Sequence, residues 1–234
     1  MNELEKQLNY PLGETLAPAG GTLEVAPGVR WIRMSLPFAL NHINLWLLRD
    51  CIDGVEGWSI VDCCIHRDEA KAQWESIFAN ELQGLPILRV IVTHMHPDHI
   101  GLAHWLTERW GVRLWISGTD YNAARLASQS TTGFGGESAA AFMASHGLTD
   151  PDAVDKVRKR SNYYASMVPQ VPARFRRLMG GDTFRIGDHD WACHAGYGHA
   201  PEHISLHCAA LGVLISGDMV LPRISTNVSV IDLE

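Results

Sequence analysis

The sequence predicts an α/β fold made of one domain. Apolar, β-branched runs alternate with stretches of helical periodicity, which is the pattern of strands layered against helices. The chain has 234 residues, of which 46% are hydrophobic and 19% charged, as in a globular domain large enough to bury a core. Residues 1–234 are therefore expected to form a single domain.

The first predicted strands come early in the chain. Residues 1–30 are rich in Gly and Pro and predict an irregular lead-in, with one strand around residues 21–34. The runs HINLWLLRD (42–50) and GWSIVDCCI (57–65) are apolar and separated by a turn-forming segment, so they predict a hairpin.

The next stretch alternates helix and strand. Its predicted elements are a helix over 67–82, a strand over 88–94, a helix over 99–111 and a strand over 112–117. Ala70, Trp74 and Ile77 share one face of the first helix, and Gly111 is placed to end the second. The strand LRVIVTH is continuously apolar, which is typical of a strand buried on both faces.

A helical insertion is predicted at about residues 119–180. Three of its stretches have helical composition, and Pro151 suits the first turn of the last one. Strands return after it. The predicted strands cover residues 182–188, 189–196, 203–209 and 213–218, and the first two form a hairpin.

The segment VIVTHMHPDHIGLAHWL (90–106) concentrates side chains that bind metals. Borderline metals such as Zn²⁺ take imidazole nitrogen and carboxylate oxygen as ligands. A helix N-cap role would account for Asp98 alone and would leave three imidazoles unexplained. Two metal sites can be served from this one bend if His94 and His96 turn one way and Asp98 and His99 the other.

The pattern T-H-x-H-x-D-H-I-G after a buried strand resembles the signature of the metallo-β-lactamase superfamily. Three further segments resemble that family, and they are WSIVDCCI (58–65), GYGHAPEHISLH (196–207) and LISGDMVL (214–221). Their order and spacing fit over residues 40–225. The resemblance implies an αββα sandwich, in which two sheets pack between layers of helices.

The resemblance also implies a set of ligands for two divalent metal ions. The six implied ligands are His94, His96, Asp98, His99, His199 and Asp218. His199 would complete the first site, and Asp218 would bridge both ions. Asp62 would steady a ligand imidazole from behind. Zn is the first choice of metal, with Fe and Mn as alternatives.

Hydrolysis is the activity that the resemblance implies. A bound metal lowers the pKa of water to about 7 and so provides a metal-bound hydroxide. Asp98 would be the catalytic residue that passes a proton to the leaving group. The expected substrate is a small ester or thioester, because Asp218 stands where some lactamases place a Cys. The pattern is closer to thioesterases of the glyoxalase II kind and to lactonases.

One element of the family pattern is absent from the sequence. The family supplies a last histidine for the second metal some tens of residues after the bridging Asp, whereas the last histidine here is His207. We therefore expect a domain that is incomplete at its C-terminus and a weak second site. Generic bacterial hydrolases that the sequence resembles carry a winged-helix-like C-terminal domain. The alternative is a natural chain with a depleted second site.

Several residues are candidates for contacting substrate. Arg174, Arg176 and Arg177 belong to a basic cluster in an otherwise acidic protein and predict binding of an anionic small molecule, the alternative being a solvated helix face. Tyr197 lies beside His199 and is expected to contact substrate or to pack. His203 and His207 are expected to be structural or surface residues.

Other functions remain open. A metal-dependent ribonuclease of the same fold is the main alternative, and a non-catalytic metal-binding module is the second. A di-iron redox protein would replace one ligand histidine and carry a flavin domain. His96 is intact and no flavin domain is visible, which argues against that interpretation.

The sequence predicts a cytoplasmic location. The five cysteines are odd in number and lack a C-x-x-C pair, which indicates reduced thiols. We see neither a signal-peptide pattern nor an apolar run approaching the ~20 residues of a membrane span. The net charge of −7 argues against general nucleic-acid binding. An uncovered edge of the second sheet would favour a homodimer.

Overall fold

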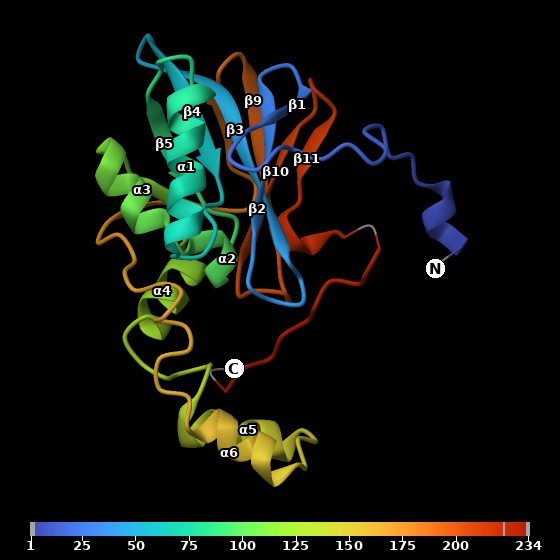
Figure 1. The fold of residues 1–234 in the computed structure, drawn as a ribbon, viewed down its shortest axis with the longest axis vertical. Helices are drawn as coiled ribbons and strands as arrows, with labels where there is room; N and C mark the ends of the chain where they lie inside the picture. The colour runs from blue at the N-terminus through green and yellow to red at the C-terminus, as the bar shows by residue number, and fades with distance from the viewer. Residues whose placement is uncertain (1–2, 222, 233–234) are drawn as a thin grey trace.

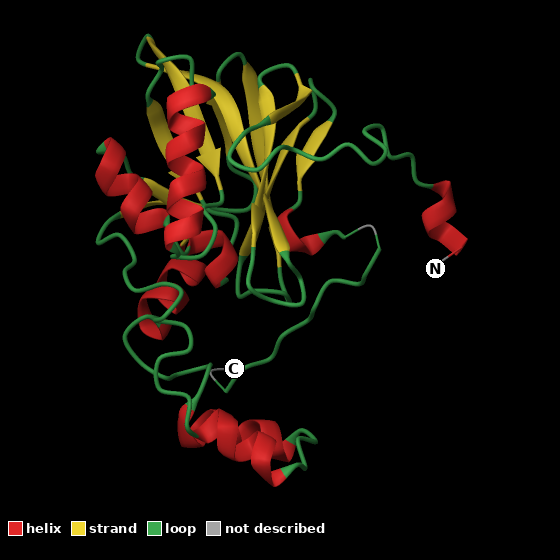
Figure 2. Cartoon of the chain, viewed as in Figure 1, coloured by secondary structure: helices red, strands yellow, loops and turns green. Residues whose placement is uncertain are grey.

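A computed structural model describes residues 3–221 and 223–232 of the chain. Within these residues the strands form two sheets that pack face to face (Figures 1 and 2). The seven-stranded sheet has the order β1-β2-β3-β4-β5-β6-β7, and the four-stranded sheet has the order β11-β10-β9-β8. The α/β expectation and the two-sheet sandwich are therefore confirmed.

The seven-stranded sheet is antiparallel at its start and parallel at its end. Its strands are β1 (Leu23–Ala26), β2 (Val29–Ser35), β3 (His42–Ile52), β4 (Val55–Val61), β5 (Ile87–Ile91), β6 (Leu114–Ser117) and β7 (Phe175–Leu178). Strands β1 to β4 pair antiparallel, and β4 to β7 pair parallel. Ile60 and Val90 point to the helices, while Val61 and Ile91 point to the second sheet. The carboxyl ends of the parallel strands meet at one edge, where the candidate site lies.

Helices α1, α3 and α4 pack on the outer face of this sheet (Figure 1). The helices are η1 (Glu3–Gln7), α1 (Asp68–Asn80), α2 (Pro97–Ile100), α3 (Ala103–Trp110), α4 (Gly118–Ala127), α5 (Gly136–Ser145), α6 (Pro151–Arg158) and η2 (Gly217–Met219). Helix α1 buries Ala70, Trp74 and Ile77, as predicted. The Trp74 indole N–H also donates to the Cys63 carbonyl at 2.9 Å, which ties α1 to the loop after β4. No helix in the described residues has the length and hydropathy of a bilayer-crossing segment.

The four-stranded sheet covers the inner face of the larger one. Its strands are β8 (Thr183–Ile186), β9 (His189–Gly196), β10 (His203–Cys208) and β11 (Val213–Ile215). Trp191 and Leu206 of this sheet pack in one buried cluster with Val61 of the larger sheet. Arg89 of β5 forms a buried ion pair with Asp50 of β3 at 2.8 Å within the larger sheet. It also donates to the Arg185 carbonyl of β8 at 3.0 Å, and this bond connects the two sheets.

Two predicted elements are each split in the structure. Residues 21–34 form the hairpin β1–β2 instead of one strand, because Gly28 adopts a left-handed φ of 71° in the turn. The helix predicted over 99–111 is broken between Ile100 and Ala103. Gly111 does end α3 in the left-handed conformation, as predicted.

The predicted helical insertion is shorter than expected. Helices α4, α5 and α6 confirm its helical part, but Phe175–Leu178 form strand β7, which pairs parallel with β6. Phe175 packs against the core on the helix side of the sheet, and Leu178 is buried between the two sheets. Pairing with the edge of β6 therefore makes residues 175–178 a strand. Helices α5 and α6 pack on each other and project away from the sheets (Figure 1).

Candidate metal centre

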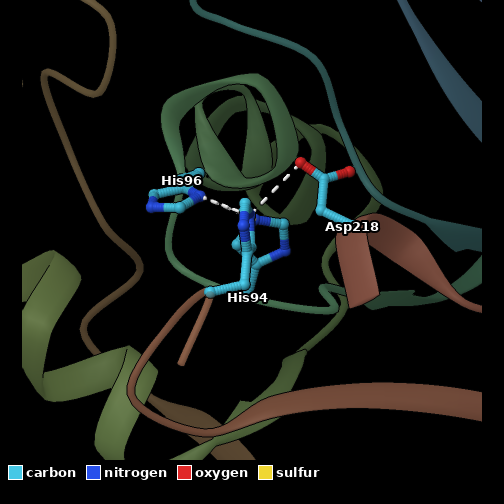
Figure 3. Close-up of side chains that lie close together, drawn as sticks. His94, His96 and Asp218 are labelled. Atoms are coloured by element: carbon cyan, nitrogen blue, oxygen red, sulfur yellow. Dashed lines mark hydrogen bonds and ion pairs between the residues drawn. The ribbon is translucent and has the colours of Figure 1, made fainter. Parts of the chain in front are cut away.

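The predicted metal ligands meet at one end of the two sheets. His94, His96, Asp98 and His99 follow β5, His199 lies in the loop between β9 and β10, and Asp218 follows β11 in η2. Figure 3 shows His94, His96 and Asp218 pointing toward one another. The structure therefore brings together all six ligands that the sequence implies.

The bend that carries four of them is shaped by Pro97 and Gly101. His96 is extended because a residue before proline avoids the helical region, and Pro97 then occupies the first turn of α2. His96, and not Asp98, is the N-cap residue, so the capping alternative for Asp98 is wrong. A side chain at position 101 would lie 2.6 Å from the Ile65 Cα atom. Glycine there lets the loop after β4 pack directly against the bend.

The first ligand group consists of three imidazoles and one carboxylate. His94 Nε2 and His96 Nδ1 lie 2.9 Å apart, and His96 Nδ1 lies 2.9 Å from His199 Nε2. Asp218 Oδ2 lies 3.3 Å from His199 Nε2. All four ligand atoms lie within 4.8 Å of one another. This convergence of nitrogen and oxygen donors suits a single four-coordinate metal ion.

The second ligand group shares Asp218 with the first. Asp218 Oδ1 lies 3.4 Å from His99 Nε2, and Asp98 Oδ2 lies 3.7 Å from the same nitrogen. The two oxygens of Asp218 thus face different groups, as a bridging carboxylate requires. Within the described residues this group has three protein ligands.

The buried atoms of the site fit a divalent cation. His99 Nε2 is buried and has no hydrogen-bond partner in the described part of the chain. A buried, unpaired nitrogen is costly unless something occupies the space that it faces. Imidazole and carboxylate donors are the set that Zn²⁺ and similar metals prefer.

The pKa shifts of the ligand histidines also favour a bound metal ion. Burial, together with the neighbouring imidazoles, lowers the pKa of His94 well below its usual value and that of His96 to about 3. Both are therefore neutral and keep a lone pair for a metal. Burial would also lower the pKa of His99, but the Asp62 and Asp98 carboxylates outweigh it and raise that pKa. The carboxylates favour a positive charge here, which a metal ion supplies in place of a proton.

Asp62 supports the ligand His99 of the second group, which is the role that the family resemblance implies for it. Its carboxylate accepts a hydrogen bond from His99 Nδ1 at 2.8 Å and another from the Thr93 amide at 2.8 Å. This fixes the proton on Nδ1 and leaves Nε2 free for a metal. Asp62 itself has a left-handed φ of 63°, which aspartate tolerates better than most residues.

Asp120 is a supporting residue that the sequence analysis missed. It is buried at the start of α4, and its two oxygens accept hydrogen bonds from the Met95 amide at 2.7 Å and the Glu202 amide at 2.6 Å. Met95 lies between His94 and His96, and Glu202 lies just after His199. Burial raises the pKa of Asp120 to about 6, so the carboxylate is ionised at neutral pH. The only sequence signal is Ser117-x-x-Asp120, a helix-start pattern.

Two other contacts hold the ligand loops. The buried Tyr164 hydroxyl, from the insertion, donates to the Met95 carbonyl at 2.5 Å. His199 Nδ1 donates to the Asn227 carbonyl at 2.8 Å, which turns Nε2 toward the site. Neither contact has a local sequence signal, because the partners lie 69 and 28 residues apart.

His203 has the structural role that the sequence allowed for it. It is fully buried, and its ring stacks on His94 with centroids 4.7 Å apart. Its Nε2 accepts a hydrogen bond from the Asp218 amide at 3.3 Å. His203 therefore contacts both a first-group ligand and the bridging residue. His207 is only partly buried and lies near His194.

The predicted substrate residues separate into two places. A cavity of about 260 Å³ opens beside the first ligand group, and we call it the His96–His199 cavity. Its lining residues are Met95, His96, Phe134, Tyr197, Gly198, His199, Ala200, Pro201, Ser229 and Ile231. Tyr197 lines it, as predicted. Arg176 instead stacks on Trp115 and Arg177 lies beside Gly118, so the structure does not bring these arginines into the cavity. Arg174 is exposed.

Comparisons with known proteins agree with the family that the sequence motifs resemble. The sequence profile of the metallo-β-lactamase superfamily matches residues 40–233. The probable metallo-hydrolase YqjP of Bacillus subtilis (strain 168) is 26% identical over 199 residues, which cover 84% of this chain and 58% of that protein.

Solved structures of similar proteins also belong to this family. A β-lactamase domain protein from Burkholderia ambifaria is 56% identical with a TM-score of 0.90, covering 100% of this chain and 66% of that one. A metallo-β-lactamase family protein from Thermus thermophilus shares the fold, with 22% identity and a TM-score of 0.67 over 89% of this chain and 65% of that one. The chain spans less than two thirds of the length of each of these three relatives.

Proposed function

The chain belongs to the metallo-β-lactamase superfamily, and on that basis we propose that it is a metal-dependent hydrolase of a small ester or thioester. The observation that carries the proposal is the pair of ligand groups that share Asp218. We propose two divalent ions, Zn first, with the second held more weakly because its group has three protein ligands in the described chain.

A bound pair of divalent ions would supply a hydroxide nucleophile at neutral pH and polarise the bond to be cleaved. The chain's own residues perform the remaining tasks. Asp98 Oδ2 lies 3.7 Å from His99 Nε2, and the Asp98 side chain is 19% exposed. As a metal ligand, Asp98 would be ionised, and its carboxylate could take a proton from the attacking water and pass it to the leaving group.

Asp218 and the imidazoles fix the reacting centre in space. Asp62, the Asn227 carbonyl and Asp120 accept hydrogen bonds that hold His99, His199 and the 94–96 bend, respectively. Ligands held by such supporting bonds need little rearrangement when a reaction begins. Because the bridging position is Asp and not Cys, we favour an ester or thioester over a lactam.

The cell compartment and the assembly are further proposals. All five cysteines are free thiols, which supports a reducing, cytoplasmic environment. Strand β11 is an edge of the four-stranded sheet, and Leu214 on it is 50% exposed. This edge supports a homodimer through β11.

The decisive experiment combines metal analysis with a substrate screen. The purified chain loaded with Zn²⁺ is offered neutral esters, thioesters, lactones and a short RNA, with and without a chelator. We expect chelator-sensitive cleavage of an ester or thioester, lost in Asp218→Ala and kept in the control His189→Ala. Cleavage of RNA alone would favour the ribonuclease alternative, and metal binding without any cleavage would favour a binding module.

A further inference from the structure

The His96–His199 cavity adjoins the reacting centre directly. Two of its lining residues, His96 and His199, are first-group ligands. A substrate bound at the centre can therefore place one of its groups in this cavity.

Apolar and aromatic side chains form part of the cavity wall. Met95, Phe134, Tyr197 and Ile231 line it together with the polar Ser229, and no Lys, Arg, Asp or Glu lines it among the described residues. A charged group buried among these side chains, away from the ligand histidines, would lose water without gaining an ionic partner, which is unfavourable. An apolar group would gain free energy from burial.

A second cavity, of about 200 Å³, lies beside the second ligand group. The apolar Trp46, Leu214 and Val220 line it together with the polar Asn44 and Ser216 and with the ligands His99 and Asp218. No cationic Lys or Arg lines this cavity either, within the described chain. Among the described residues, the two cavities thus lack the basic side chains that bind an anionic group.

The insertion fixes one wall of the His96–His199 cavity. Phe134 lies between α4 and α5, and its ring centroid lies 5.0 Å from that of Tyr164. Tyr164 in turn binds the Met95 carbonyl within the ligand bend. Phe134 is therefore held at a fixed depth relative to the metal ligands.

We propose that the His96–His199 cavity binds an uncharged, apolar group that flanks the scissile bond, and that Phe134 limits the length of that group. The substrate class is then a neutral ester or thioester with an alkyl or aryl group. This inference rests on the proposed hydrolase function, because it assigns a substrate to that same site.

The test uses ligands that bind without being cleaved. Straight-chain alkyl hydroxamates, from acetohydroxamate to octanohydroxamate, chelate divalent metals through the hydroxamate group and leave the alkyl chain to fill a neighbouring cavity. Their dissociation constants for the Zn²⁺-loaded chain are measured by calorimetry. We expect about fourfold tighter binding per added methylene until the cavity is filled. A hydroxamate of equal length that ends in a carboxylate should bind more weakly than its neutral counterpart.

Three variants sharpen the result. In Phe134→Ala, the alkyl chain length at which the hydroxamate affinity stops increasing should be longer than in the wild type. Phe142→Ala, in the same insertion but outside the cavity lining, should leave that chain length unchanged. Tyr197→Lys alters a side chain that is 69% exposed, so folding should tolerate it. This variant should bind the carboxylate-ended hydroxamate more tightly than the wild type does.

The outcomes separate this inference from the proposed function. Affinity that is flat with chain length, tighter binding of the charged ligand by the wild type, or no hydroxamate binding to the metal-loaded chain would each overturn the cavity assignment. A length-dependent gain without cleavage of any ester or thioester would overturn only the hydrolase proposal. Ester cleavage with flat hydroxamate affinities would overturn only the cavity assignment.

Discussion

Asp120 accepts a 2.7 Å hydrogen bond from the amide of Met95, the residue between the proposed metal ligands His94 and His96. The other oxygen of the same carboxylate accepts a 2.6 Å bond from the Glu202 amide, beside the loop of His199. One buried side chain thus sets the distance between the two loops that supply the first ligand group.

Asp120→Ala should weaken metal binding at the first site. The variant leaves two buried amides without an acceptor, and loss of such a supporting contact lowers metal affinity on the order of 10–100-fold. Competition with a chromophoric chelator measures the change. Asp152→Ala, which removes an exposed carboxylate on α6, is the matched control. Equal affinities in both variants would show that Asp120 does not position the loops.

Asp62→Asn should affect the second site in particular. Asparagine tolerates the left-handed φ of 63° at this position, so the backbone is kept while the charge that orients His99 is lost. We expect roughly 10–100-fold weaker binding of the second metal equivalent and a smaller change in the first. Metal content after dialysis should fall toward one equivalent. Retention of both equivalents with unchanged affinity would contradict the role of Asp62.

Tyr164→Phe should destabilise the fold without removing any metal ligand. The buried hydroxyl donates to the Met95 carbonyl, and its loss leaves that carbonyl unpaired. The free energy of unfolding should fall by about 1–3 kcal/mol. Denaturant unfolding measures it, and Tyr163→Phe, in which the changed ring is 45% exposed, serves as the control. Equal stabilities of the two variants would argue against a structural hydrogen bond at Tyr164.

The cysteines should differ sharply in reactivity. Cys51 is exposed, while Cys63, Cys64, Cys193 and Cys208 are buried. Burial raises the pKa of Cys64 to about 12, so its thiol stays protonated and unreactive between pH 7 and 9. Because ionisation is disfavoured in the folded state, this thiol lowers the free energy of unfolding only as the pH rises from about 9 toward 12.

Mass spectrometry after iodoacetamide treatment checks this prediction. The native chain should gain a single adduct, at the exposed Cys51, faster at pH 9 than at pH 7 because the reactive thiolate fraction increases with pH. The unfolded chain should gain five adducts. Several adducts on the native chain at pH 7 would mean that the buried thiols are more accessible than the structure indicates.

The sequence predicts the ligands of the site better than their supports. His94, His96, Asp98 and His99 stand in one short motif, and their spacing alone indicates a metal site. Asp120 and Tyr164 act through backbone groups of Met95, and such contacts leave no spacing pattern in the chain. They depend on how α4 and the insertion pack against the bend.

The same reasoning explains the errors in the secondary structure. Strand β7 has two exposed arginines at its centre and no alternating apolar pattern, and it is a strand only because β6 offers an unpaired edge. Aspartate is a residue type that is common at the N-cap, which favoured Asp98 for that position. Pro97, however, occupies the first helical position, so His96 is the N-cap residue. Tertiary pairing and backbone restriction override local propensity in these two places.

The most direct test of the account is anomalous X-ray diffraction from crystals of the Zn²⁺-loaded chain, recorded at the zinc edge. The account predicts one anomalous peak among His94, His96, His199 and Asp218, and a second, weaker peak among Asp98, His99 and Asp218. A structure with no peak between these side chains, or with zinc bound only elsewhere on the surface, would contradict it.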